Sequence, residues 1–256
     1  MPILFKSVKV QINLFLIAFA VFLYLKNPSF GFLAGFFWAI LFSVLAEAAI
    51  LYFKTKKFQI TDSALTSGLI IGYVLSSESP WWMFMTVATC AVGLKRVLRF
   101  HGKNLLNPAA LGIFLAVLLL NGTTEWKGAY EWYLLIPAGF YLVNKIKKLE
   151  IVWGYFGMAL LLFIPQALRQ GTPLVNIPGY FNYFFIFIML IEPKTTPPTL
   201  WPKIVFGAAV ALLVFLLTEL GFRYEPELFA LLVLNALVPL LNKIPNFKFS
   251  TPKKIT

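Results

Sequence analysis

The sequence predicts an all-α, polytopic membrane protein with about ten transmembrane segments, and three observations support this. Of the 256 residues, 60% are hydrophobic and only 12% are charged. The apolar residues fall in long runs rather than at amphipathic spacing, so lipid must be the solvent for most of the surface. Lysine and arginine gather at alternate ends of these runs. We therefore expect a single membrane domain over 1–256, without a sizeable domain outside the membrane.

Ten segments follow from the hydrophobic runs and from the helix-breaking residues that separate them. Their expected bounds are 10–25, 30–53, 63–76, 81–95, 105–121, 128–144, 151–168, 176–191, 203–220 and 225–242. The first segment has basic residues before its apolar core, as a signal peptide has. No small-residue cleavage motif follows it, so we interpret it as a retained helix.

The distribution of positive charge predicts the orientation. If the first segment starts in the cytoplasm, only Lys26, Lys127, Arg169 and Arg223 of the 22 lysines and arginines face outward. The remaining 18 lie on the cytoplasmic side, as the positive-inside rule requires. We expect both termini in the cytoplasm of a bacterial inner-membrane protein. The net charge of +12 is then a signal of topology rather than of nucleic-acid binding.

Two segments are too short or too interrupted to cross the bilayer as simple helices, which need about 20 residues. One is 63–76, which we expect to be broken at Gly68 and Gly72. The other is the run 180–191, which follows Pro178 and Gly179.

The spacing of the two short segments, about 118 residues, indicates an internal repeat. The same offset maps Pro80 onto Pro198 and Pro108 onto Pro226. With five segments in each half, the halves must be inverted relative to each other, and broken helices would meet near the midplane. The expected repeats are about 10–121 and 128–243, followed by a cytoplasmic tail, 244–256. Chance spacing of the prolines is the alternative.

Polar residues inside or at the ends of segments are candidates for an ion or ligand pathway. They are Glu47, Glu192, Thr195, Thr196, Glu225, Glu227 and Asn235. For Glu47, pairing with a cytoplasmic lysine or snorkelling toward the cytoplasmic face is the competing interpretation. Glu225 and Glu227 would also suit the positive end of the tenth helix, and Asn235 could form a helix-to-helix hydrogen bond.

Asn107 and Pro108 suit the N-cap and the first turn of a helix. With Lys95, Arg99 and Lys103 nearby, this helix start is a predicted seat for an anionic group such as a phosphate. A basic cluster that meets lipid headgroups is the alternative.

Cysteine and histidine are too few for metal chemistry. Cys90 and His101 are single, which excludes a disulfide framework, an iron–sulfur cluster, a zinc site and a haem with two axial histidines, so we expect no metal. Any redox chemistry would need an organic cofactor.

Three motifs carry a resemblance to a known family: Asn107-Pro108-Ala109, Glu192-Pro193 with Thr195-Thr196-Pro197, and Tyr224-Glu225 through Phe229-Ala230. Together they resemble the B subunit of sodium-translocating NADH:quinone oxidoreductase and the D subunit of the Rnf electron-transport complex, over about 30–243. The resemblance implies a ten-helix, inverted-repeat fold similar to urea transporters. It also implies a flavin-bearing membrane subunit, with FMN or riboflavin, in an ion-pumping redox complex.

Members of that family carry FMN on a threonine in an outward-facing Ser-Gly-Ala-Thr motif. The nearest stretch here is 169–174, in which Gly171, Thr172, Pro173 and Leu174 follow Arg169 and Gln170. The acid, serine and alanine that precede the threonine in the family are absent. The resemblance thus points to Thr172 and Gly171 as cofactor residues, and a plain turn is the alternative.

Two functions remain open at this point. The first is a membrane subunit of a flavin-dependent electron-transfer complex, coupled to movement of Na⁺ or H⁺, with other membrane subunits as partners. The second is a stand-alone transporter or channel, or a homo-oligomer of one, that moves a small solute or vitamin through the same fold. No nucleotide loop or hydride-donor site occurs in the chain, so any catalysis would be shared with partners.

Overall fold

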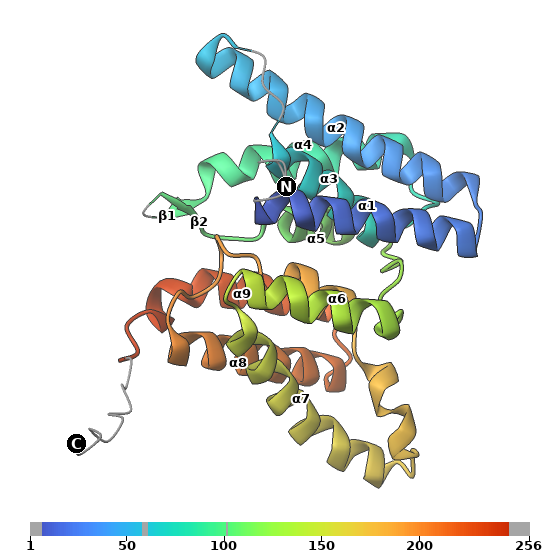
Figure 1. Ribbon diagram of the computed structural model, residues 1–256, viewed down its shortest axis with the longest axis vertical. Helices are drawn as coiled ribbons and strands as arrows, with labels where there is room; N and C mark the ends of the chain where they lie inside the picture. Colours follow the sequence, from blue (N-terminus) through green and yellow to red (C-terminus); the bar gives the residue numbers. More distant parts are fainter. Residues whose placement is uncertain (1–6, 58–60, 101, 246–256) are drawn as a thin grey trace, which may run out of the picture.

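The computed structural model describes residues 7–57, 61–100 and 102–245, with side chains at all of these except Phe100, Lys103 and Leu174. Helices form two groups, stacked one above the other in Figure 1. The first group consists of α1 (Val8–Lys26), α2 (Phe30–Thr55), α3 (Asp62–Val74), α4 (Trp81–Val97) and α5 (Pro108–Leu120). The second consists of α6 (Trp132–Lys145), α7 (Leu149–Arg169), a 3₁₀ turn η2 (Leu174–Tyr180), a π-helix η3 (Phe185–Met189), α8 (Leu200–Glu219) and α9 (Pro226–Leu241).

The all-α prediction is confirmed. In the described part of the chain, the strands are β1 (Arg99–Phe100) and β2 (Lys103–Asn104), a short antiparallel hairpin between α4 and α5. By length and apolar composition, α1, α2, α7 and α8 could each cross a membrane. Large apolar side chains such as Phe30 and Leu161 are well exposed on these helices. Apolar surfaces of this kind suit contact with lipid, so this is a multi-pass membrane protein.

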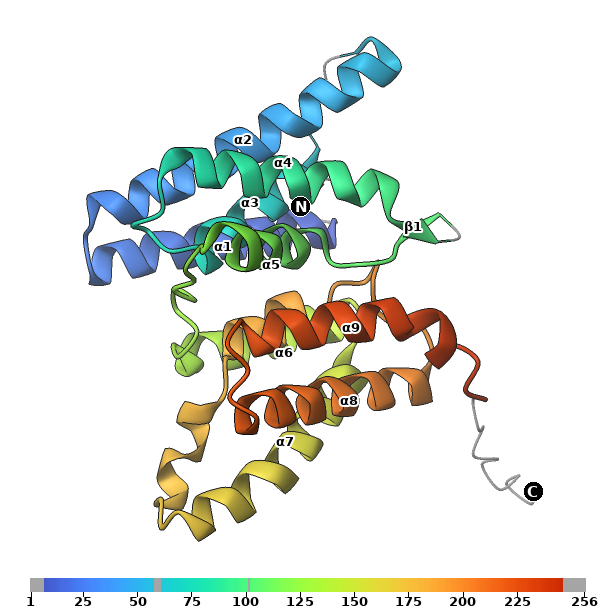
Figure 2. The same ribbon diagram turned by 180° about the vertical axis from the view of Figure 1, so that it is seen from behind.

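Successive helices run in alternating directions, so the molecule has two sides. We call the side where α1 begins the N side and the side where α1 ends the far side. The end of α2, the hairpin, and the end of α9 lie with the N side in Figures 1 and 2. The turn after α7 and the connection between α5 and α6 lie on the far side. Connections that the sequence analysis assigned to one side of the membrane therefore lie together in the molecule.

The expected break of 63–76 at its glycines is wrong. Helix α3 is continuous over 13 residues, and its N-cap Thr61 accepts a hydrogen bond from the Ala64 amide. A Cβ at Gly68 would lie 2.8 Å from the Ile40 Cα, and one at Gly72 would lie 2.8 Å from the Phe36 ring. The two glycines therefore serve close packing of α3 against α2, which the spacing of small residues alone does not distinguish from a break.

The other short segment is truly discontinuous. The chain runs through the 3₁₀ turn η2, turns at Phe181 and Asn182, and re-enters as the π-helix η3. The Asn182 side chain accepts a hydrogen bond from the Phe185 amide at 2.9 Å and thereby caps the second piece. Pro178 lies within η2, and proline removes an amide donor from a helix. The second group thus holds a buried, broken segment where the first group holds the short helix α3.

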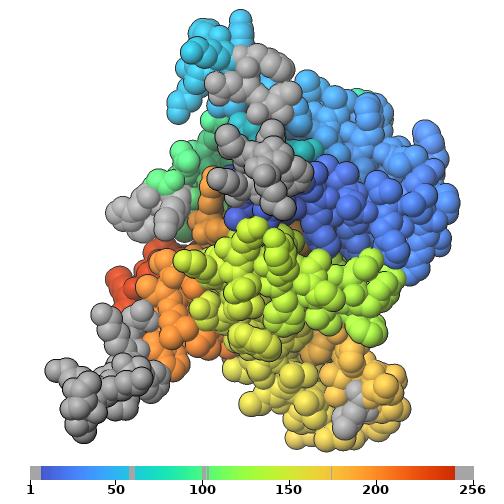
Figure 3. Space-filling model, viewed as in Figure 1, coloured from blue at the N-terminus to red at the C-terminus, as the bar shows by residue number. Residues whose placement is uncertain are grey.

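The two groups contact each other directly. Helices α1 and α6 lie side by side on the face shown in Figure 3. The Lys26 ammonium pairs with Glu131 at 2.6 Å on the far side, and the Lys145 ammonium donates to Gln11 at 2.6 Å on the N side. In the core, the rings of Tyr73 (α3) and Phe184 lie 4.7 Å apart. The short elements of the two groups therefore meet in the interior. Unpaired backbone groups at their ends would be costly there, so these ends need hydrogen-bond partners or a polar cavity.

Candidate functional site

The ends of the short elements are joined by a buried hydrogen-bond network. The Asn107 amide N–H donates to Asn235 Oδ1 at 3.0 Å, and Asn107 Nδ2 donates to the Met189 carbonyl at 3.3 Å. Asn235 Nδ2 donates to the Thr195 carbonyl at 3.2 Å. Asn107 also caps α5 by accepting from the Ala110 amide. Two asparagines thus tie α5, α9 and the chain after η3 together, and the predicted helix-to-helix role of Asn235 is what the geometry shows.

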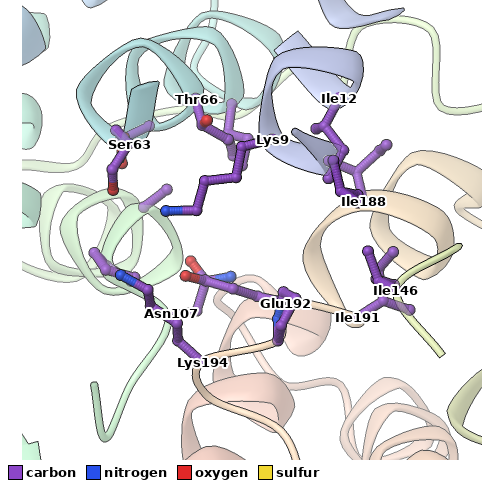
Figure 4. A pocket seen from close by; sticks show the side chains of 16 residues that line it. Lys9, Ile12, Ser63, Thr66, Asn107, Ile146, Ile188, Ile191, Glu192 and Lys194 are labelled. Atoms are coloured by element: carbon purple, nitrogen blue, oxygen red, sulfur yellow. The ribbon is translucent and has the colours of Figure 1, made fainter. Parts of the chain in front are cut away.

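Glu192 and Lys194 line a cavity of about 220 Å³ on the N side, together with Asn107. The cavity lies between the start of α1, α3 and the end of the η3 segment, and its walls are mainly apolar. Figure 4 shows Lys9 and Glu192 reaching into it from opposite walls. Among the described residues, no ion pair joins the Glu192 carboxylate to a cation. Glu192, a predicted pathway residue, therefore lines a cavity.

A second cavity, of about 550 Å³, adjoins the network from the N side. Thr195, Thr196, Asn235 and Lys194 line it, so four predicted or neighbouring residues meet there. Asn104 also lines it: the residue is 5% exposed, and its Nδ2 has no hydrogen-bond partner among the residues that the structure describes. A buried amide donor without a partner costs about 1–3 kcal/mol, so Asn104 leaves hydrogen-bonding capacity unused beside this cavity.

Glu47 is neutralised by two cations of α4. Its carboxylate lies 3.2 Å from Lys95 Nζ and 3.0 Å from Arg96, and it is buried. Lys95 also donates to Ser63 Oγ at the start of α3, at 2.7 Å. The competing interpretation of Glu47, an ion pair with a lysine of the N side, therefore describes the contacts. The cluster ties α2, α3 and α4 together.

The predicted phosphate seat is not assembled around Asn107. Lys95 is held by Glu47 and Ser63, and Arg99 is exposed on β1. The backbone of Lys103 lies in β2, and its side chain is outside the described part. The start of α5, where the sequence predicts an anion site, instead holds the hydrogen bonds between Asn107 and Asn235.

Thr172 and Gly171 lie far from the other predicted cofactor residues. They end α7 on the far side in a Schellman turn, in which Gly171 has φ +66°. The Thr172 amide donates to the Ala167 carbonyl at 2.9 Å and the Gly171 amide to the Leu168 carbonyl at 3.2 Å. A turn therefore accounts for the backbone at Thr172, and the residue is partly exposed.

Glu225 and Glu227 mark the far-side start of α9. Glu225 is its N-cap residue, and its carboxylate accepts hydrogen bonds from the Thr124 hydroxyl and, at 2.9 Å, from the Trp126 indole. Glu227 lies in the first turn of α9. The two carboxylates stand at the positive end of the helix, as the dipole interpretation expects, and Glu225 also anchors the connection between the two groups.

Lys127, which is not among the predicted site residues, covers the far-side end of α3. Lys127 is 6% exposed; its ammonium donates to the Leu75 carbonyl and lies 3.1 Å from Glu125 Oε2. Burial lowers the pKa of Lys127. Burial alone would raise the pKa of Glu125, but the Ser77 donors and the Lys127 ammonium hold it below its usual range.

One signal could have identified Lys127. It lies 118 residues after Lys9, the same offset that relates the prolines, and Lys9 lines the N-side cavity. Asn104 carried no comparable signal, because a free amide is recognised only once its surroundings are known.

Helices with buried polar ends inside an apolar fold define a class, the polytopic membrane proteins with discontinuous segments. The sequence model of the NQR2, RnfD, RnfE family matches this chain over residues 5–130 and 119–249. The chain belongs to that family.

Curated relatives are named as the D subunit of an ion-translocating oxidoreductase complex. The protein from Yersinia enterocolitica is 31% identical over 54% of this chain and 40% of its own length. The one from Stutzerimonas stutzeri is 23% identical over 84% of each chain, and an Escherichia coli relative is 29% identical over 52% of this chain and 39% of its own length. The match to the Yersinia and Escherichia proteins thus spans about two fifths of their length.

Proposed function

We propose that this protein is a membrane subunit of a flavin-dependent electron-transfer complex, coupled to movement of Na⁺ or H⁺, and that its partners are other membrane subunits. Membership of the family supports the electron-transfer role, because relatives carry the name of such a complex. The observation that carries the proposal is the N-side cavity with the unpartnered Asn104 amide, since it matches the needs of a polar heteroaromatic ring.

The architecture that we propose is ten crossings in two inverted repeats, similar to urea transporters, with both termini in the cytoplasm of a bacterial inner membrane. An offset of about 118 residues takes the starts of α4 and α5, Trp81 and Pro108, to within a residue of those of α8 and α9. It takes α2 onto α7 and α3 onto the broken segment around η3. The excess of lysine and arginine on the N side supports a cytoplasmic N side.

The residues of the 550 Å³ cavity fit a flavin ring. The volume lies in the usual range for small-molecule sites, about 300–1,000 Å³. Val238, Leu240 and the side chain of Asn104 would hold the ring, and the ammonium groups of Lys194 and Lys243 would stabilise negative charge on the reduced ring. When bound, the flavin supplies the electron-accepting chemistry that the side chains lack.

Coupling to an ion needs a polar route near the flavin. In this proposal Glu192, Thr195 and Asn235 form that route beside the two N-side cavities, both of which Lys194 lines. We propose that the ion passes this point. Glu47 holds the scaffold through its two cations, so Glu47→Gln is expected to weaken ion coupling while the protein still inserts.

Flavin binding is tested on the protein purified from membranes. We expect the native protein to show a flavin spectrum and to release the flavin on denaturation. Asn104→Leu should reduce the bound flavin to about a tenth, which corresponds to roughly 1.4 kcal/mol of binding free energy. Asn144→Ala, an exposed amide on the same side, is the matched control. Ultraviolet fluorescence of a band on a denaturing gel, abolished by Thr172→Val, would reveal covalent FMN on the far side in addition. A colourless protein that moves a solute in liposomes would overturn the redox function.

A further inference from the structure

Lys9 and Lys127 occupy equivalent positions at opposite ends of the molecule. They lie 118 residues apart, in the first helix of the first group and just before the first helix of the second. Each lies beside the end of a short element that belongs to the other group. Lys127 contacts the end of α3, at Leu75, and Lys9 faces Glu192 beyond the end of η3. The same offset carries Val74 onto Glu192.

The far-side end is closed by several contacts at once. The Lys127 amide donates to the Tyr73 carbonyl at 2.8 Å, and the Glu125 amide donates to the Val74 carbonyl at 2.9 Å. The Lys127 ammonium covers the next carbonyl, that of Leu75. The last carbonyls of α3 are thus capped by the connection that follows α5, which lies across them as a short antiparallel bridge. Lys127 and Glu125 are among the residues that line a far-side cavity of about 670 Å³.

The N-side end is open. Lys9 is exposed, and in the described part of the chain neither Lys9 nor Glu192 takes part in an ion pair. The cavity between them extends along α3 past Ser67 to Ile70. The next residues of α3 towards Lys127 include Tyr73, whose ring contacts that of Phe184 and whose carbonyl accepts from the Lys127 amide. One end of the boundary between the two groups is therefore accessible while the other is closed.

We propose that Lys127 and Lys9 are paired gates of one path between the two groups, with Glu125 and Glu192 as their counter-ions, and that the structure has the far gate closed and the N-side gate open. Closing the N-side gate brings the Lys9 ammonium onto Glu192 and divides the cavity. Alternating opening of two ends is how inverted-repeat proteins move an ion past a fixed site. The inference rests on the ion coupling proposed above.

The far gate is tested by thiol labelling in membrane vesicles. Labelling needs neither flavin nor partner subunits, so its result is independent of whether the redox function is correct. In a Cys90→Ser background, Val74→Cys is expected to resist a membrane-impermeant maleimide added on the far side. Adding Lys127→Ala should raise the labelling rate about tenfold, because the end of α3 loses its cover. Lys26→Ala, which removes another far-side ion pair, is the control and should leave the rate unchanged.

Two further variants keep this test decisive if Lys127→Ala does not fold. Lys127→Arg preserves the charge and should keep Val74→Cys protected, whereas Glu125→Gln removes the counter-ion and should raise labelling severalfold. Labelling of Val74→Cys at the same rate in all variants would overturn the far gate.

The N-side gate is tested by cross-linking. Lys9→Cys with Glu192→Cys should form a disulfide when an oxidant is added, because closure brings the two positions together. Lys9→Cys with Lys243→Cys, on the same side but at a different cavity, should remain reduced. Equal yields from the two pairs, or no disulfide from the first, would overturn the N-side gate.

Discussion

The far end of α3 and the N-side end of the η3 segment are equivalent by position in the chain, yet they have opposite surroundings. At the first, backbone amides and the buried Lys127 satisfy the carbonyls of the last turn. At the second, Glu192 faces a cavity, and Met189 and Thr195 receive their hydrogen bonds from the asparagines of the neighbouring helices. Segments at equivalent positions thus end in a closed contact or beside a cavity, depending on which residues from other elements pack against them.

The largest expected effect concerns the network at the accessible end. Asn235→Ala leaves the Asn107 amide and the Thr195 carbonyl buried without partners, so the free energy of unfolding should fall by about 2–4 kcal/mol. Thermal inactivation in detergent measures this. Asn144→Ala, whose side chain is exposed, should change little. Equal stability of the two variants would mean that the asparagine network does not hold this end.

A smaller effect is expected from the connection that closes the other end. Gly128 has φ +74°, and a Cβ there would lie 2.7 Å from the Phe19 ring. Gly128→Ala should therefore destabilise the connection by about 1–3 kcal/mol and expose the end of α3 to labelling from the far side. Gly102→Ala introduces the same backbone strain at a position with no described atom within 4 Å, so comparing the two variants isolates the steric effect of the Phe19 contact. Labelling that rises equally in both variants would contradict a role for packing against α1.

The smallest effect is expected from pH. Glu125 has a pKa below its usual value, so its carboxylate stays ionised at neutral pH, while the lowered pKa of Lys127 sets the alkaline limit of their contact. The stabilisation that the carboxylate provides is present above its unfolded pKa, about 4.3, and is lost only as the pH falls through its lower folded pKa. Labelling of Val74→Cys should thus stay constant between about pH 6 and pH 8. A rise across this range would show that another group controls the contact.

Much of the fold was predictable because apolar length and capping residues act locally. The runs around α1, α2, α7 and α8 are long enough to span a bilayer, and Thr61 and Asn107 start helices by capping them with their own side chains. The break before η3 was predictable from its proline and glycine. The predicted break at the glycines of α3 was wrong. Glycines occur both at helix breaks and at close helix contacts, and the sequence alone does not show that α2 packs against them.

The candidate site was predictable in part. Asn235 was expected to bond to another helix, and it does. For Glu47, the sequence predicts a cationic partner but not which one, because Lys95 and Arg96 lie 48 and 49 residues away. Lys127 and Asn104 were missed as site residues, since a lysine in a connection and an asparagine in a hairpin look like ordinary surface residues until their burial is known.

By itself, the sequence determined that this chain lies in a membrane and where most of its helices start, because hydrophobicity and capping depend on neighbours along the chain. Only the tertiary structure decided which polar groups are satisfied. That depends on distances between residues far apart in sequence, and it is why Lys127 closes one end while Asn104 and Glu192 are left facing cavities.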